Sequence, residues 1–169
     1  LTTTEADYLK VVMNKTAILM AAACEIGGLL GHVSEEFIVA LRHYGQNLGI
    51  AFQLADDVLD YTSELNEFGK VEGTDLKEGK LTLPLIVALR HAGEADKKII
   101  RNALIANRLE RAQLKEVLSV IESFGGIQYT LDLAKNYIKR AQEALSPFKP
   151  SLEKEALISL TDYVVTRKS

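Results

Sequence analysis

The amino-acid sequence predicts an all-α protein, and three observations support this prediction. Apolar residues recur at the i, i+3, i+4 spacing of a buried helical stripe in several segments. No segment alternates apolar and polar residues for long enough to indicate a strand. Residues typical of helix ends, such as Ser34, Gly93 and Pro147, lie between the apolar segments. With 169 residues, 47% of them hydrophobic, the chain can bury one sizeable core, so we expect a single domain over residues 1–169.

Two long helices are expected in the first part of the chain. Thr4 and Asp7 have the T-x-x-D spacing of a capping box, which opens a helix that runs to about Leu30. Ser34 is expected to cap a central helix from Glu35 to about Tyr61. The apolar stripe of this central helix comprises Phe37, Leu41, Tyr44, Leu48, Phe52, Ala55 and Leu59.

Shorter helices are expected after a loop. Thr62 to Thr82 shows neither helix nor strand periodicity. Pro84 is tolerated in the first turn of a helix, so Leu81–His91 is expected to form a short apolar helix that Gly93 ends. The remaining expected helices are Ala95–Ala106, Arg111–Phe124, Ile127–Leu145 and Leu152 to about Val165.

Composition and charge restrict the class of protein. A net charge of −3 argues against a nucleic-acid partner, which would require a basic face. Cys24 is the single cysteine and cannot form an internal disulfide, so a cytoplasmic protein is the simplest expectation. The longest run without Asp, Glu, Lys or Arg, His43 to Ala55, is shorter than a bilayer span, so no transmembrane segment is expected.

The end of the central helix carries an unusual polar cluster. At about 100° per residue, Gln53, Asp56, Asp57 and Asp60 fall within about 60° of one direction. Neighbouring carboxylates repel one another and oppose the helix dipole at a C-terminus. A Mg²⁺ ion would reverse this penalty, because it prefers oxygen ligands and shares its coordination between carboxylates, water and substrate phosphates. A solvated acidic helix end is the alternative, and the pattern D-D-x-x-D alone does not decide between the two.

The loop that follows favours the metal interpretation. It contains the pattern G-K-x-x-G-T-D-L-x-x-G-K, whose glycines, lysines and aspartate are Gly69, Lys70, Gly73, Asp75, Gly79 and Lys80. Loops this long inside a compact domain are usually functional or disordered. Lysines beside a carboxylate cluster suit a diphosphate that Mg²⁺ bridges to the protein and that ammonium groups neutralise.

Lys15 is the only charged residue between Val11 and Cys24, and Thr16 follows it. An ammonium group on a helix otherwise built for burial is costly unless it reaches the surface or meets an anion. Both alternatives remain open on the residues alone.

A family resemblance extends over these segments. The stretch FQLADDVLD followed by GKVEGTDLKEGKLTLPLIVAL resembles the second aspartate-rich region of the trans-prenyltransferases, the isoprenyl diphosphate synthases. The version DLKEGKLTLPL is more similar to the long-chain polyprenyl diphosphate synthases than to the farnesyl enzymes. The stretch NKTAIL resembles the K-T motif of the family, in which the lysine grips the allylic diphosphate. The resemblance implies the C-terminal half of the isoprenoid synthase helical bundle.

The resemblance implies a Mg²⁺-dependent reaction that adds isopentenyl diphosphate to an allylic diphosphate. Asp56, Asp57 and Asp60 would hold a metal on the allylic diphosphate. The implied catalytic residues, which would stabilise the departing diphosphate, are Lys15, Lys70 and Lys80. The implied substrate-binding residues are these three lysines with Thr16, Gln53 and Arg167, the last near isopentenyl diphosphate.

The resemblance also has a limit. The family carries its first aspartate-rich motif in an N-terminal half, whereas this sequence has one D-D-x-x-D. We therefore expect the C-terminal portion of a longer, homodimeric synthase, inactive on its own. The alternative is a non-catalytic regulatory subunit, or a diphosphate-binding module that pairs with a complete synthase.

Overall fold

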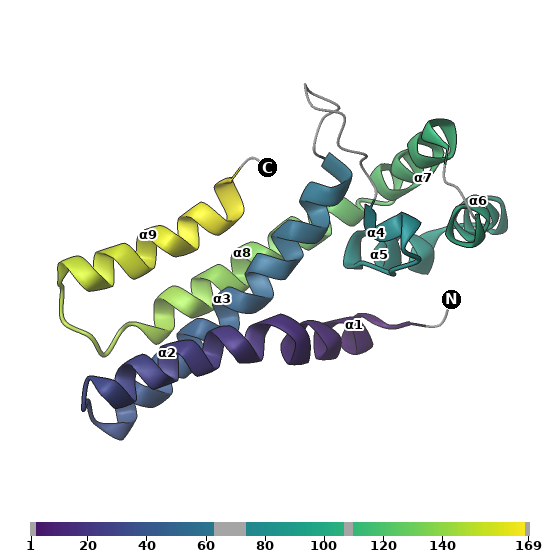
Figure 1. The fold of residues 1–169 in the computed structure, drawn as a ribbon. Helices are drawn as coiled ribbons and strands as arrows, with labels where there is room; N and C mark the ends of the chain where they lie inside the picture. The colour runs from purple at the N-terminus through teal and green to yellow at the C-terminus, as the bar shows by residue number, and fades with distance from the viewer. Residues whose placement is uncertain (1–2, 63–73, 107–109, 168–169) are drawn as a thin grey trace. The chain divides into compact units, whose positions relative to one another are not determined.

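The computed structural model describes residues 3–62, 74–106 and 110–167, and within these ranges it contains helices and no strand. The first helices are α1 (Glu5–Val12), the π-helical segment Met13–Ala17, α2 (Ile18–Leu30) and α3 (Glu35–Thr62), as Figure 1 shows. The later ones are α4 (Thr74–Lys77), α5 (Leu83–His91), α6 (Glu94–Ile105), α7 (Arg111–Ser123), α8 (Gly126–Ala144) and α9 (Leu152–Thr166). The all-α prediction is confirmed.

Local sequence signals explain where several helices begin. Thr4 and Asp7 form the expected capping box, because the Asp7 amide donates to Thr4 Oγ1 at 3.2 Å and the Thr4 amide donates to Asp7 Oδ2 at 3.0 Å. Pro84 lies in the first turn of α5. Gly93 was expected to end α5. In the structure Ala92 is the C-cap of α5, and Gly93 is the N-cap of α6.

The described residues divide into two compact units. The first unit contains residues 3–8, 56–62, 74–106 and 110–131, and the second contains residues 9–55 and 132–167. Each unit has an apolar cluster of its own, and the expected single domain over residues 1–169 stays a prediction. Each unit is therefore considered separately below.

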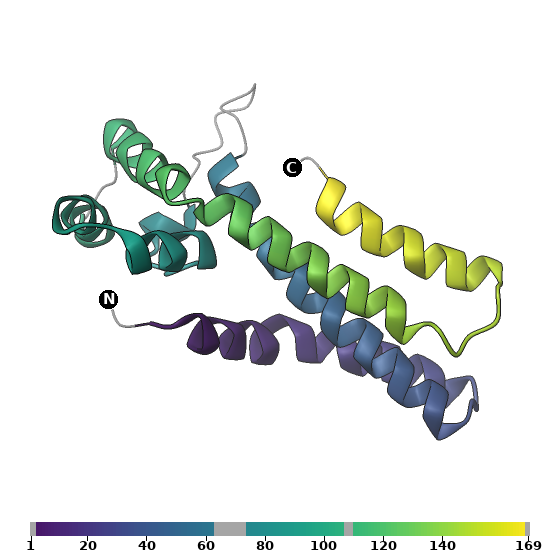
Figure 2. The same ribbon diagram turned by 180° about the vertical axis from the view of Figure 1, so that it is seen from behind.

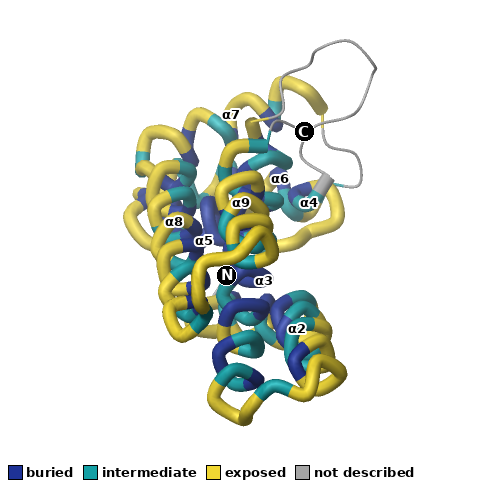
Figure 3. Tube along the Cα trace, turned by 90° about the vertical axis from the view of Figure 1, so that its left-hand side faces the viewer, coloured by how far each residue is buried: buried dark blue, intermediate teal, exposed yellow. Residues whose placement is uncertain are grey.

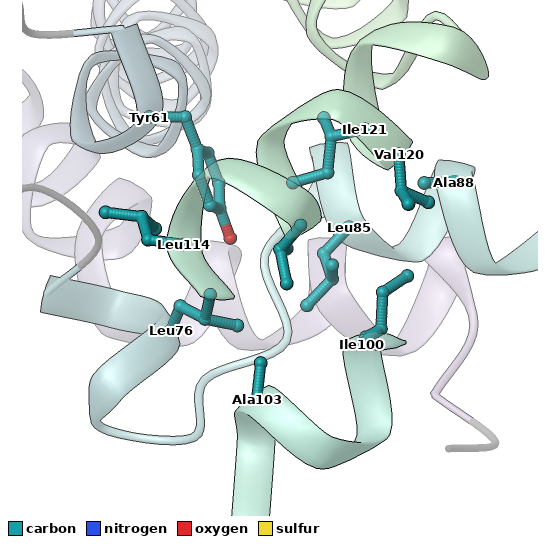
Figure 4. Close-up of a cluster of buried hydrophobic side chains, with 10 residues drawn as sticks. Tyr61, Leu76, Leu85, Ala88, Ile100, Ala103, Leu114, Val120 and Ile121 are labelled. Carbon is teal, nitrogen blue, oxygen red and sulfur yellow. The ribbon is translucent and has the colours of Figure 1, made fainter. Parts of the chain in front are cut away.

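The first unit is built around an apolar cluster from the end of α3 and from α4 to α7. Its buried members are Tyr61, Leu76, Leu85, Ala88, Ile100, Ala103, Leu114, Val117, Val120 and Ile121 (Figure 4). Leu76 of the single-turn helix α4 is fully buried and points into this cluster. The cluster therefore fixes the short segment that precedes Lys80.

The second unit packs α3, the later part of α8 and α9 around another apolar cluster. Its buried members are Tyr44, Leu48, Ala51, Ala55, Ile138, Ala141, Leu145 and Val164. Figures 1 and 2 show α8 running alongside α3. The Tyr44 hydroxyl donates to the carbonyl of Leu157 in α9 at 2.9 Å, so α9 is also held to α3 by a hydrogen bond.

Two glycines let α3 cross the preceding helix at very short range. A Cβ atom on Gly45 would lie 2.5 Å from the Met20 carbonyl oxygen, and one on Gly49 would lie 2.6 Å from Ala17 Cα. Distances this short are not compatible with a side chain, so backbone meets backbone at this crossing. Ala17 is the last residue of the π-helical segment, which places that segment directly against α3.

The helices α1 and α2 expose an apolar face within the second unit. Its large exposed side chains are Val11, Ile18, Leu19, Ile26, Leu29 and Leu30. Figure 3 shows exposed residues over much of α2. Contiguous apolar surface of this kind is typical of a contact region. None of the described helices is long and apolar enough to cross a bilayer.

Candidate active site

The acidic end of α3 belongs to the first unit, and its three aspartates have different surroundings. Asp56 and Asp60 are partly exposed, whereas Asp57 is only 3% exposed. Periodicity alone placed all three on one polar side of the helix. The Tyr8 hydroxyl of α1 donates to Asp57 Oδ2 at 2.6 Å, so Asp57 is buried with a hydrogen-bond donor. Burial, and then the Asp57 charge, raises the pKa of Tyr8, which keeps its hydroxyl protonated.

Asp60 is held by the loop that follows α3. Its Oδ2 accepts a hydrogen bond of 3.0 Å from the backbone amide of Asp75, in the first turn of α4. The Asp75 carboxylate in turn accepts a hydrogen bond of 2.9 Å from Lys80 Nζ. A chain of polar contacts thus connects the D-D-x-x-D motif with Lys80, inside the first unit.

Lys80 is paired with two carboxylates. Its ammonium group lies 2.6 Å from Glu78 Oε2 and 2.9 Å from Asp75 Oδ1. Hydrogen bonds to Glu78 and then to Asp75 raise the pKa of Lys80, so it stays charged. Its side chain is about half exposed, at 47%, and its contact with a diphosphate stays a prediction. Lys70, the other lysine of this loop, lies outside the described residues.

Lys15 and Thr16 lie in the π-helical segment of the second unit. Lys15 is exposed, and Thr16 Oγ1 donates to Gln53 Oε1 of α3 at 3.0 Å. Short π-helical segments inside α-helices occur frequently at functional sites. The structure therefore brings together two predicted substrate-binding residues, Thr16 and Gln53, which lie 37 positions apart.

Arg167 packs on α3 in the second unit. Its guanidinium carbon lies 4.2 Å from the centroid of the Phe52 ring, which is a cation–π distance. Its Nη2 donates a long hydrogen bond of 3.5 Å to the Phe52 carbonyl. Binding of isopentenyl diphosphate by Arg167 stays a prediction.

Two residues that were not predicted to belong to the site, Tyr8 and Asp75, contact the D-D-x-x-D motif in the structure. Asp75 was noted only as part of the loop pattern. The Tyr8 hydroxyl contacts Asp57 across 49 positions, a separation that periodicity does not cover. Asp75 carries a weak signal, because an aspartate in a glycine-rich stretch favours local turns and helix starts.

The donor set fits a metal that is shared with a ligand. Within the described ranges, no three His, Cys, Asp or Glu side chains gather as a ligand set for a metal. Mg²⁺ does not need such a set, because it is commonly bound by one or two carboxylates together with water and phosphate oxygens. The partly exposed Asp56 and Asp60 supply hard oxygen donors. These residues therefore fit Mg²⁺ bridged to a diphosphate better than a cage made by the protein alone.

An all-α chain whose central helix ends in D-D-x-x-D, with a K-T pair on another helix, has the features of an isoprenyl diphosphate synthase. Residues 1–121 match the family model described as polyprenyl synthetase. The chain therefore belongs to the polyprenyl synthetase family, that of the trans-isoprenyl diphosphate synthases.

Relatives and solved structures agree with this assignment. The chain is 39% identical over 168 residues to a geranylgeranyl diphosphate synthase of Methanosarcina mazei, covering 98% of the chain and 49% of that relative. It is 39% identical over 165 residues to an octaprenyl diphosphate synthase of Haemophilus influenzae, covering 98% and 50%. A Caulobacter crescentus polyprenyl synthase, solved with calcium and isoprenyl diphosphate, superposes with a TM-score of 0.91 at 39% identity, covering 99% and 51%. The chain spans about half the length of the curated relatives it matches.

Proposed function

We propose that this chain carries the second aspartate-rich region of a polyprenyl diphosphate synthase, which adds isopentenyl diphosphate units to an allylic diphosphate. The observation that carries the proposal is the hydrogen-bond network at the end of α3. There Asp57 accepts a hydrogen bond from the Tyr8 hydroxyl, and Asp60 accepts one from the Asp75 amide. The Caulobacter crescentus relative was solved with calcium and isoprenyl diphosphate, which supports a divalent metal and a prenyl diphosphate as ligands here.

Each predicted residue has a role in this proposal. Asp56, Asp57 and Asp60 would hold Mg²⁺ on the allylic diphosphate. When bound, Mg²⁺ neutralises the charge that develops on the departing diphosphate. Lys15, Lys70 and Lys80 add positive charge around the same group. The diphosphate leaves, the double bond of isopentenyl diphosphate attacks the allylic carbon, and loss of a proton gives an allylic diphosphate longer by one isoprene unit.

Thr16, Gln53 and Arg167 are proposed to arrange the substrates. The Thr16–Gln53 hydrogen bond presents polar oxygens beside the reacting carbon, where positive charge develops. Arg167 supplies a guanidinium group for isopentenyl diphosphate, since arginine binds phosphate oxygens well. We further propose a cytoplasmic homodimer, which the single cysteine and the apolar face on α1 and α2 support.

Prenyl transfer by a chimera tests the proposal. Residues 1–169 are joined to the N-terminal half of the Haemophilus influenzae octaprenyl diphosphate synthase, and incorporation of labelled isopentenyl diphosphate into farnesyl diphosphate is measured with Mg²⁺. We expect turnover by the chimera and none by residues 1–169 alone. Asp56→Ala should lower turnover by a factor of about 100 or more, because it removes a ligand of the Mg²⁺ that would neutralise charge on the departing diphosphate.

Asp132→Ala is the matched control, because Asp132 lies on α8 and its exposed carboxylate pairs with Lys135 at 3.4 Å. This variant should keep the parent rate. Equal rates for Asp56→Ala and the parent would contradict the role of Asp56. A chimera that binds Mg²⁺ and pyrophosphate yet transfers no prenyl group would instead favour the alternative, a non-catalytic diphosphate-binding module.

A further inference from the structure

The contact between Tyr8 and Asp57 joins two buried groups of the first unit. Tyr8 is 7% exposed and Asp57 is 3% exposed. Their oxygen atoms lie 2.6 Å apart, within the range of a hydrogen bond from a hydroxyl group to an ionised carboxylate. Burial of a carboxylate is unfavourable unless donors compensate for lost water, so the Tyr8 hydroxyl replaces part of the hydration of Asp57.

Independent contacts fix Tyr8 itself. Glu5 lies one turn earlier on α1 and accepts hydrogen bonds from the Tyr129 hydroxyl at 2.9 and 3.0 Å. Arg90 Nη2 of α5 lies 3.2 Å from the same carboxylate. The start of α1 is therefore anchored to α5 and α8 of the first unit without help from Asp57. Tyr8, three residues after Glu5 on the same helix, therefore lies on a turn that is held in place by contacts other than its own bond to Asp57.

We propose that Tyr8 is a positioning residue for the metal site, acting through Asp57. Its hydroxyl holds the Asp57 carboxylate in one orientation, next to Asp56 in the chain, before metal and diphosphate bind. This inference rests on the proposed function, since it concerns the same site. Hydrogen-bond partners of metal-site side chains typically contribute a factor of about 10 to 100 in metal affinity.

The test is the affinity of Tyr8→Phe for Mn²⁺ in the presence of pyrophosphate. Mn²⁺ replaces Mg²⁺ because its free and bound forms are distinguished by electron paramagnetic resonance. Tyr8→Phe keeps the ring in place and removes the donor, so we expect Mn²⁺ to bind about tenfold more weakly. The matched control is Tyr44→Phe, because Tyr44 is 1% exposed and its hydroxyl donates to the Leu157 carbonyl in the second unit. Tyr44→Phe should lower thermal stability without changing Mn²⁺ affinity.

A double-mutant cycle separates positioning from a general loss of structure. If Tyr8 acts through Asp57, Tyr8→Phe should cause no further loss of Mn²⁺ affinity in an Asp57→Asn background. Glu5→Gln leaves the Tyr8 side chain intact but loosens its anchor, so a smaller loss is expected. This variant remains informative if Tyr8→Phe does not fold.

The outcomes are distinguishable. Parental Mn²⁺ affinity in folded Tyr8→Phe would overturn the positioning role and leave the proposed function standing. If the effects of Tyr8→Phe and Asp57→Asn on Mn²⁺ affinity simply add in the cycle, the positioning role is overturned in the same way. If Tyr8→Phe does not fold, a Glu5→Gln variant that binds Mn²⁺ as tightly as the parent would overturn the positioning role. Absence of pyrophosphate-dependent Mn²⁺ binding in the parent chain would remove the proposed site, and the positioning role with it.

Discussion

Gly49→Ala should destabilise the protein by about 1–3 kcal/mol or more, because the new methyl group has no space. Its Cβ would lie 2.6 Å from Ala17 Cα and 3.2 Å from Ala17 Cβ. Ala17 Cα is a backbone atom of the π-helical segment, so no side-chain rotation relieves the clash. The two segments would have to separate, and the Thr16–Gln53 hydrogen bond should weaken with them. Urea-induced unfolding, followed by circular dichroism, measures the change.

Gly27→Ala is the matched control and should have the opposite sign. Gly27 is an exposed helical glycine in α2, and a Cβ at this position has no atom within 4 Å. Alanine in a helix interior is more favourable than glycine by about 1 kcal/mol, so the variant should be stabilised. A Gly49→Ala variant as stable as Gly27→Ala would show that α3 does not cross the π-helical segment at this short range.

Leu76→Ala should lower the free energy of unfolding by about 2–5 kcal/mol, because it leaves a cavity where α4 packs among fully buried side chains. The helix α4 has one turn, and its residue Leu76 is fully buried. Such a short helix has little stability of its own, so its position depends on this side chain. Loss of the side chain should release the Asp75 amide from Asp60. Hydrogen exchange at the Asp75 amide should therefore become faster, alongside a lower unfolding midpoint.

Leu152→Ala is the corresponding control, because Leu152 is 80% exposed at the start of α9. It should change stability by less than about 0.5 kcal/mol. Unchanged exchange at Asp75 would argue against the anchoring role of Leu76.

The helices were predictable because their signals are local. The central helix was expected from Glu35 to about Tyr61 and spans Glu35–Thr62, since its apolar stripe and its start signal lie within the segment itself. The helix α4 was not predicted, because four residues are too few to show a period. The π-helical segment was also not predicted, because a change to i→i+5 hydrogen bonds over five residues of a continuous helix has no recognisable sequence pattern.

The candidate site was predictable by residue type but not by surroundings. Charge repulsion on α3 identified the three aspartates, yet only the fold shows that Asp57 is buried under Tyr8. Contact of the loop lysines with a diphosphate stays a prediction, and only the fold shows that Lys80 is paired with Asp75 and Glu78. Contacts between distant residues and competition among neighbouring charges depend on tertiary structure, and periodicity does not contain them.

The glycine crossing also limits how far part of the site can move. Side chains at an ordinary helix interface can change rotamer and let two helices shift, but backbone atoms have no such freedom. Thr16 precedes Ala17 at the crossing, and Gln53 lies one turn beyond Gly49 on α3. Their hydrogen bond is therefore next to a point of the second unit where backbone packs directly on backbone. The Thr16 and Gln53 side chains should therefore be ordered before a substrate reaches them, and binding should order them little further.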